Sequence, residues 1–383
     1  MIYLDHCAST RVYDEVIDLV SENLRSCYVN PSSLYQLAAD AQSEIEAARD
    51  FLSQDLHCAS QNLVFTSGAT ESVNSAYFQV MHKHYRNPAQ IAYCTGAHAV
   101  SLALAKRAEA EGFQLLPYAL KRDASPDLES LESQLKSSSQ VLLIDAILVN
   151  NETGAVLDLD ALVALRDRYA PRALIHVDCV QAWGKLDLYL DRSGIDFASF
   201  AGHKIHAPKG VGLLYVKNPQ RFKAFIVGGG QQHNRRSGTE NHPLVLALAK
   251  AVEIRQRAGT IEAQNAEIAS LRHYFLAGLR DIPHRVHAAK LQIPQILNIA
   301  FPGLRAETLL HCLEREGILV SSSSACHASD RQGSHVLRAM GLSDEEASAS
   351  IRLSFSRENS CEELDSALAA FKRSLEFLKY IAD

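Results

Sequence analysis

The stretch Ser199-Phe200-Ala201-Gly202-His203-Lys204 lies between an apolar segment that ends in Asp178 and a second apolar segment at 210–216. Lys204 follows Gly-His at the end of an apolar run, so we expect it at an element boundary and not on a solvated helix face. A desolvated lysine with cationic neighbours has a lowered pKa and can trap a carbonyl group as a Schiff base. Taken alone, Lys204 could also be an ordinary surface lysine, and the residues around it decide between the two readings.

Strand-like and helix-like segments alternate along the chain on the N-terminal side of this stretch. Strands are expected at 63–66, 90–94, 114–120, 141–149 and 173–178, and helices at about 99–111, 128–136 and 159–169. This alternation is typical of a mainly parallel sheet wrapped by helices, in which ligands gather at the carboxyl ends of the strands. We therefore predict an α/β fold. A further helix is expected around 34–52, with Leu34, Leu37 and later apolar residues on a face that packs in the core.

The segment Ser67-Gly68-Ala69-Thr70 follows the strand at 63–66 and precedes a helix. A strand that runs into small residues and a helix start presents free backbone N–H groups and hydroxyls, which suit a phosphate group. The same residues could form a plain turn with a helix cap.

Other polar residues also stand at the predicted strand ends, namely His98, Asn151 and Asp178. Asp178 ends an apolar strand, where burial of an unpaired carboxylate is costly in free energy. It therefore needs a partner, and a protonated ring nitrogen would serve. Alternatively, Asp178 caps the next turn. Gln181, three residues later, should point roughly the same way. His98 could stack on a flat cofactor and transfer protons, or be a satisfied loop histidine.

The length of 383 residues predicts two lobes, because single hydrophobic cores usually stop growing below this size. Helix dominates from about 243 to 279, with a break near Gly259, and we place the boundary near residue 260. We expect a large domain at 12–260. A small α+β domain should combine 1–11 with 261–383, using strands at 295–301, 318–321 and 350–355 and helices at 306–316 and from 361 onward.

Two residues of the small domain carry chemistry. Cys326 lies in the small, polar run 321–334, where we expect it to be exposed, unlike the seven other cysteines; Arg331 and a protonated His327 could lower its thiol pKa. Such a run could also be a mere linker. Arg352 interrupts an apolar strand and needs an anion, for which a carboxylate is the natural partner.

Composition excludes several classes of function. The chain is 47% hydrophobic and 21% charged, as in ordinary globular proteins, and its net charge of -6 argues against a general polyanion binder. No apolar run approaches membrane-spanning length and no basic leader precedes the first strand, so we expect a cytoplasmic protein without membrane or direct nucleic-acid binding. The eight cysteines form no C-x-x-C pair and no metal-ligand spacing.

Together these residues resemble the pyridoxal-phosphate (PLP)-dependent cysteine desulfurases related to class V aminotransferases, in particular their long-loop, iron-sulfur-cluster type. The matching motifs cover nearly the whole chain and are jointly specific. They are Tyr3-Leu-Asp5, Asn30-Pro-Ser-Ser33, Thr66 to Ser72, Val149 to Gly154, His176 to Gln181, Gly202 to Ile205, Pro208 to Gly212, Arg236 to Asn241, Ser324-Ala-Cys326, Ser334 to Leu337 and Ser350 to Ser354.

The resemblance implies PLP fold type I, in which a seven-stranded, mainly parallel sheet belongs to the large domain. At the matching positions it implies that Lys204 carries PLP as a Schiff base and that Asp178 pairs with the pyridinium nitrogen. It also implies that His98 stacks on the ring and that Asn151 and Gln181 contact the region of the ring hydroxyl.

At the phosphate end the resemblance implies contacts from Ala69, Thr70 and His203, and from Thr239 of the second subunit of a homodimer. It further implies that Arg352, with Asn151, holds the carboxylate of L-cysteine.

Cys326 would attack the substrate sulfur, which leaves a persulfide on the enzyme and releases L-alanine. A partner protein would then accept the sulfur, for iron-sulfur assembly, tRNA thiolation or DNA phosphorothioation.

The sequence departs from the family pattern at several positions. Ala201 replaces a usual serine near the phosphate, so another donor could substitute there. Gly96-Ala97 replaces Thr-Glu before the stacking histidine, and His206-Ala207 replaces Tyr-Gly after the lysine. His327 follows the cysteine, as in many selenocysteine lyases. Selenocysteine lyase, cysteine sulfinate lyase and a non-catalytic scaffold therefore remain alternatives.

Overall fold

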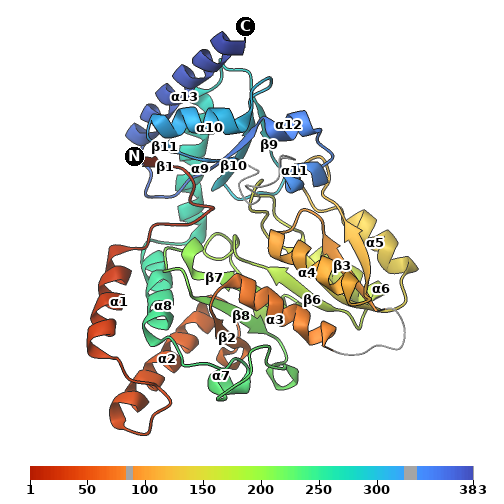
Figure 1. The fold of residues 1–383 in the computed structure, drawn as a ribbon, viewed down its shortest axis with the longest axis vertical. Coiled ribbons are helices and arrows are strands. Elements are labelled where there is room, and N and C mark those ends of the chain that lie inside the picture. The colour runs from red at the N-terminus through yellow and green to blue at the C-terminus, as the bar shows by residue number, and fades with distance from the viewer. Residues whose placement is uncertain (83–88, 323–333, 383) are drawn as a thin grey trace.

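The computed structural model describes residues 1–82, 89–322 and 334–382. Within these residues the chain forms a seven-stranded sheet, a four-stranded sheet and a two-stranded pair, with helices around them (Figure 1). No helix in these ranges is long and apolar enough to cross a membrane. The predicted α/β class is confirmed.

The seven-stranded sheet forms the centre of the larger body in Figure 1. Its strand order is β2-β8-β7-β6-β5-β3-β4, and β3 to β7 run parallel, whereas β8 is antiparallel to both β7 and β2. The strands are Leu63–Thr66 (β2), Gln90–Cys94 (β3), Gln114–Tyr118 (β4), Val141–Ile147 (β5), Leu174–Asp178 (β6), Phe197–Ala201 (β7) and Gly212–Val216 (β8).

Helices cover both faces of this sheet, which explains why its central strands are buried along almost their whole length. Helices α3 and α4 pack on one face, and α2, α5, α6 and α8 contribute to the core on the other. The large-body helices are Asp14–Ser26 (α1), Gln36–Asp55 (α2), Ala69–Met81 (α3), Ala99–Ala110 (α4), Leu128–Ser137 (α5), Leu159–Tyr169 (α6), Gln231–Asn234 (α7) and His242–Arg257 (α8). Short 3-10 turns occur at Ser60–Asn62 (η1), Leu190–Arg192 (η2), Gly202–Lys204 (η3) and Pro219–Arg221 (η4).

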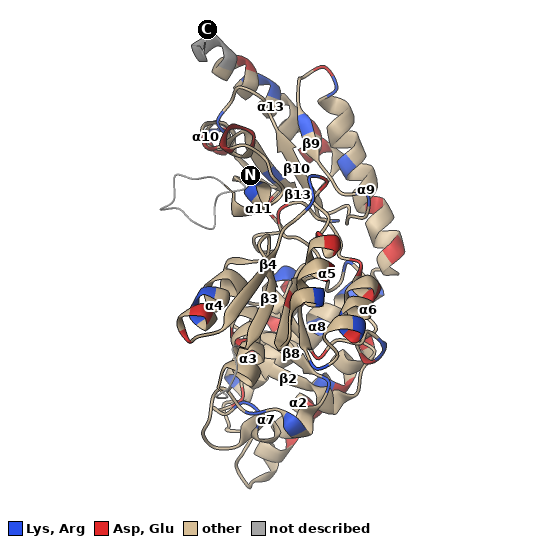
Figure 2. Cartoon of the chain, turned by 90° about the vertical axis from the view of Figure 1, so that its right-hand side faces the viewer, with Lys and Arg blue, Asp and Glu red and all other residues tan. Residues whose placement is uncertain are grey.

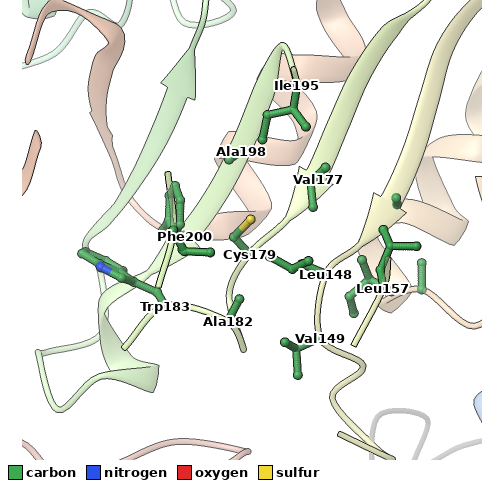
Figure 3. Close-up of a cluster of buried hydrophobic side chains, with 14 of the residues drawn as sticks. Leu148, Val149, Leu157, Val177, Cys179, Ala182, Trp183, Ile195, Ala198 and Phe200 are labelled. Carbon is green, nitrogen blue, oxygen red and sulfur yellow. The ribbon is translucent and has the colours of Figure 1, made fainter. Parts of the chain in front are cut away.

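Part of the large core lies directly behind the carboxyl ends of β6 and β7 (Figure 3). Val177 and Cys179 pack there with Ala198 and Phe200, and the Trp183 ring meets the Phe200 ring edge-on at a centroid distance of 5.2 Å. Because these side chains are almost fully buried, the two strand ends are held rigidly against each other.

The second body contains an antiparallel sheet of order β12-β13-β10-β9 with α9, α10 and α13 packed around it. Its strands are Arg285–His287 (β9), Ile296–Ala300 (β10), Ser321–Ser322 (β12) and Ser350–Ser354 (β13). Its helices are Ile261–Gly278 (α9), Ala306–Arg315 (α10), His335–Ala339 (α11), Asp344–Ser348 (α12) and Cys361–Ala382 (α13). The N-terminal strand Ile2–Tyr3 (β1) pairs in parallel with Ile318–Leu319 (β11). The division into 12–260 and 1–11 with 261–383 stays a proposal.

Two local expectations were wrong. The strand expected at 318–321 is interrupted at Val320, because β11 pairs with β1 whereas β12 pairs with β13 in another sheet. Leu34 and Leu37 were expected in the core, but they are 103% and 45% exposed. Leu34 precedes α2, and the buried stripe of α2 begins at Ala38.

Candidate active site

Most of the predicted site residues line one cavity of about 670 Å³, which we call the front cavity. It lies at the carboxyl ends of β2, β5, β6 and β7, and the N-terminal segment with β12 and β13 forms its other wall. The predicted residues that line it are Ala69, Thr70, His98, Asn151, Asp178, Gln181, His203, Lys204 and Arg352. Thr239 lines a neighbouring cavity of about 210 Å³, which shares Ser67 and Gly210 with the front cavity. Cys326 lies outside the described residues.

Lys204 is positioned by the turn that ends β7. The backbone N–H of Gly202 donates to Val211 at 3.0 Å, and that of Thr10 donates to His203 at 2.9 Å. The Lys204 Nζ donates to the carbonyl oxygens of Cys7 at 2.7 Å and Ala8 at 2.6 Å. Burial lowers the pKa of Lys204, and the nearby Arg352 cation lowers it further. The amine therefore loses its proton more readily than an ordinary lysine.

Asp178 is a buried carboxylate without a cationic partner in the described part of the chain. It is 6% exposed, and the backbone N–H of Val180 donates to its Oδ1 at 2.9 Å. Burial raises the pKa of Asp178, and the bond from Val180 and the nearby His98 and His176 oppose this effect. A positive charge placed against this carboxylate would stabilise its ionised form.

His176, two residues before Asp178, belongs to a buried polar network inside the sheet. Its Nδ1 lies 2.6 Å from Asp145 Oδ1, and its Nε2 lies 2.8 Å from Ser199 Oγ. The Tyr77 hydroxyl donates to the second Asp145 oxygen at 2.8 Å. All these side chains are fully buried, so the network fixes the strand end that presents Asp178.

The start of α3 forms the opposite end of the front cavity. Gly68 precedes the helix at φ 150° and ψ 177°, a backbone region open essentially only to glycine. A Cβ on Gly212 would lie 2.7 Å from Gly68 Cα, so glycines on both sides allow β8 to approach this turn. The turn leaves the first N–H groups of α3 free to bind an anion beside Thr70. Ser67 and Lys209 line the same cavity, where Ala201 supplies no hydroxyl.

Arg352 was predicted to need an anion, and in the structure that anion is Asp5. The Nη2 donates to Asp5 Oδ1 at 2.7 Å and the Nη1 donates to the Asn151 carbonyl at 3.0 Å. Within the described residues the Nε is buried without a hydrogen-bond partner, as is the side-chain oxygen of Asn151. Ser321 also donates to Asp5, at 2.9 Å. Asp5 belongs to one of the sequence motifs, but its contact with Arg352 was not predicted from the sequence.

Three comparisons relate the chain to known proteins. The Aminotransferase class-V family model matches residues 2–367. The chain belongs to the class V aminotransferase family. Across its whole length it is 33% identical to "Cysteine desulfurase 2" of Trichormus variabilis, of which it covers 95%.

Solved structures extend this similarity. The structure named "NIFS-LIKE PROTEIN" has a TM-score of 0.91 at 30% sequence identity. The alignment covers 98% of this chain and 99% of the chain in that structure. The structure "SspA in complex with cysteine" has a TM-score of 0.83 at 26% sequence identity. Here the alignment covers 94% of this chain and 100% of the chain in that structure.

Class V aminotransferases are PLP-dependent, and the front cavity fits this cofactor. Asp178 supplies an unpaired buried carboxylate for a protonated ring nitrogen, and the α3 start supplies free N–H groups for a phosphate. Lys204 stands in the same cavity with a lowered amine pKa. His98 begins α4, where its Nδ1 accepts from Val100 N at 3.3 Å.

Glu152 is a second residue of the front cavity to which sequence reasoning gave no role. It is 3% exposed, and Ser334 Oγ donates to its Oε2 at 2.5 Å. Burial raises the Glu152 pKa to about 7, against the opposing effects of Ser334 and Arg352. Its only sequence signal was its place in the Val149 to Gly154 motif.

This pKa predicts a pH-dependent stability. Since the folded protein holds the Glu152 proton more tightly than the unfolded chain, the contribution of Glu152 to stability falls as pH rises from about 4.5 to about 7 and is constant above. The Glu152→Gln variant keeps an oxygen for Ser334 but cannot ionise. We expect it to be more stable than wild type at pH 8, by on the order of 3 kcal/mol, and to show little gain at pH 4.5. Denaturant unfolding across this range would measure the difference; parallel curves would contradict the assignment.

The cysteines correct one expectation. Cys7, Cys94 and Cys179 are buried, but Cys361 is exposed, so Cys326 is not distinguished from all the others by exposure. Cys361 lies at the start of α13. Within the described residues, no group of three His, Cys, Asp or Glu side chains is arranged to hold a metal ion.

Proposed function

We propose that this protein is a PLP-dependent cysteine desulfurase that converts L-cysteine to L-alanine and leaves the sulfur on Cys326 as a persulfide. The observation that carries the proposal is the meeting of Lys204, Asp178 and Arg352 in one cavity. These groups supply an amine, an anion and a guanidinium, which suit an aldehyde cofactor, its ring nitrogen and an amino-acid carboxylate. The names of the relatives, including the complex with cysteine, support this choice of substrate.

When bound, PLP supplies an electron sink for the electrons of the substrate Cα–H bond. Asp178 would hold a proton on the ring nitrogen through its buried carboxylate. Thr70 and Ala69 with the free N–H groups of α3, together with His203, would hold the phosphate. Gln181 would contact the ring-hydroxyl region, on the side where its Nε2 already donates to the Cys7 carbonyl at 3.0 Å.

The substrate would be oriented by its carboxylate. Arg352 has donor hydrogens beyond those used by Asp5 and Asn151, and its Nε has no partner in the part of the chain that the structure describes. With the carboxylate fixed there, the Lys204 amine would remove the Cα proton and later return one, and His98 would assist these transfers.

Sulfur transfer then needs a thiolate. The Cys326 sulfur would attack the substrate sulfur, so that a sulfur–sulfur bond forms while the carbon–sulfur bond breaks. The electron pair of the broken bond stays on the carbon and is protonated, which gives alanine. The reaction L-cysteine plus thiol to L-alanine plus persulfide is balanced without an external oxidant.

The proposal includes a homodimer in the cytoplasm and a protein that accepts the persulfide sulfur. Thr239 lines a cavity beside the front cavity, a place that suits a group completing the phosphate site of a second copy. Several apolar side chains that are exposed in the single chain would be available for burial in such an interface. They are Leu34, Tyr35, Leu37, Ile226 and Val227.

The deciding experiment incubates the PLP-loaded protein with L-cysteine, L-selenocysteine or L-cysteine sulfinate and measures alanine and the released sulfur or selenium. We expect alanine from L-cysteine in equal amount to transferred sulfur. A strong preference for selenocysteine or sulfinate would make the protein a lyase for that substrate. Protein that shows no visible absorbance of bound PLP when PLP is added would instead favour a non-catalytic scaffold.

Asp178→Asn should lower turnover by about 100-fold to 1,000-fold, because the carboxylate that stabilises the ring-nitrogen charge is lost in a buried site. The amide preserves shape and can still accept from Val180. The pH titration of the visible absorbance of bound PLP should also change. Asp196→Asn is the control: Asp196 also accepts from a backbone N–H, that of Ile175, but it is half-buried, pairs with Arg166 and lies outside the cavity. A loss of turnover without any spectral change would contradict the role given to Asp178.

A further inference from the structure

A second cavity, of about 340 Å³, lies behind the turn that carries Lys204. We call it the rear cavity. It shares Cys7, Gln181 and Lys204 with the front cavity, so the two are separated by one layer of side chains. No step of the proposed reaction uses it. Its size is within the range of small-molecule sites.

The walls of the rear cavity are mainly apolar. Side chains from β10, α8, α9 and the end of β13 converge on it, and the ring of Trp183 closes one side. The apolar lining includes Trp183, Ile205, Ile254, Ile268, Ile296 and Phe355. An occupant must therefore have an apolar body.

Lys185 is the distinctive polar group of this cavity. Its Nζ donates to Gln181 Oε1 at 3.4 Å, and within the described residues it contacts no carboxylate. Burial lowers the Lys185 pKa to about 8, with a further lowering by the Lys204 cation. The ammonium is therefore still largely protonated at pH 7, and it would gain from an anion brought into the cavity.

Both arginines of the wall already pair with carboxylates. Arg255 pairs with Asp55 and Arg357 pairs with Glu267, although the buried Nε of Arg255 has no hydrogen-bond partner within the described residues.

Burial lowers the pKa of both His6 and His206 to about 4, so these rings are neutral at pH 7. Glu358 is the only carboxylate among the described lining residues; it lies 3.9 Å from His206 Nδ1, and burial raises its pKa. An ammonium group on the ligand would face two lysines, which disfavours an amino acid.

We propose that the rear cavity binds a small monocarboxylate with a branched apolar body and no amino group. Its carboxylate pairs with the Lys185 ammonium, and its body packs against the isoleucines and Trp183. The amide of Gln181 links this site to the front cavity, because Gln181 Nε2 donates to the Cys7 carbonyl that also accepts from Lys204 Nζ. An occupant that draws Lys185 away from Gln181 thus changes the setting of Lys204, an effect on turnover that rests on the proposed function.

Trp183 makes the binding itself directly measurable, since it is the only tryptophan of the sequence and lines the cavity. The experiment titrates the PLP-loaded protein with isovalerate and records tryptophan fluorescence. We expect a saturable change, and no comparable change with isovaleramide, which has the same shape but no charge. In Lys185→Met the affinity should fall by about tenfold or more, as expected for loss of a charge-assisted bond. Lys290→Met, an exposed lysine outside the cavity, should bind like wild type.

Two further variants keep the result interpretable. Ile254→Phe enlarges an apolar side chain of the wall, keeps Lys185 in the sequence and should also abolish the response. Arg352→Lys tests whether isovalerate sits in the front cavity instead, and it should leave the response intact. The proposal is overturned by the absence of a saturable response, by equal binding of isovaleramide, or by a response that Arg352→Lys removes and Lys185→Met preserves. None of these readouts depends on desulfurase activity.

Discussion

Lys204→Ala should reduce alanine formation from L-cysteine by at least about 10,000-fold. The variant loses the amine that would bind the cofactor aldehyde and, with it, the base that would remove the Cα proton, a proton transfer that alone is typically worth 100-fold to 10,000-fold. The amine is singled out by its setting: Lys204 is half-buried, its pKa is lowered, and within the described structure its amine bonds only to the carbonyls of Cys7 and Ala8.

The control for this variant is Lys217→Ala. Lys217 is exposed and follows the last residue of β8, outside the front cavity. Its replacement should leave turnover unchanged. The visible absorbance of the Lys204→Ala protein with added PLP should lack the Schiff-base band seen in wild type. Retention of both the band and the turnover would show that another amine carries the cofactor.

The fold was predictable because its signals are local. Strands β5 to β8 are buried on both faces, so they read as mainly apolar runs interrupted only by Asp145, His176 and Ser199, and further polar residues appear where the runs end. Asn151, Asp178 and Lys204 could therefore be placed at one edge of the sheet without knowledge of tertiary contacts. Their common position follows from the parallel topology.

The pairings between distant segments could not be predicted in this way. Arg352 meets Asp5 across 347 positions, and Glu152 meets Ser334 across 182. The first contact joins two distant segments of the second body and the second contact joins the two bodies, and no periodic pattern in the sequence predicts either. Periodicity also cannot tell a core position from an exposed apolar one, which is why Leu34 and Leu37 were misplaced.

The raised pKa of Glu152 likewise arises from contacts between distant segments. Sequence identifies a carboxylate, but its pKa near 7 arises from burial among segments that meet only in the folded chain. The role of Asp5 also depends on the folded chain, because only there does its carboxylate pair with Arg352.

Cys326→Ser should abolish sulfur transfer, lowering alanine formation from L-cysteine by at least about 1,000-fold, the scale on which loss of a nucleophile acts. A serine hydroxyl is not ionised near neutral pH and cannot accept a sulfur atom as a persulfide. Three of the thiols described by the structure are poor substitutes. Burial raises the pKa of Cys58 and Cys94 to about 12 and that of Cys179 well above its ordinary value, so these thiols stay protonated.

Cys361→Ser is the matched control, since Cys361 is the exposed cysteine of the described chain and exposure alone would make it a competing acceptor. We expect that variant to form alanine and bound persulfide like wild type, whereas Cys326→Ser forms neither and still binds PLP with unchanged absorbance. Persulfide on each variant can be measured by alkylation and mass spectrometry after one turnover. If Cys326→Ser kept full turnover and Cys361→Ser lost it, the sulfur acceptor would lie on α13, and the nucleophile assignment would move from the 321–334 run to that helix.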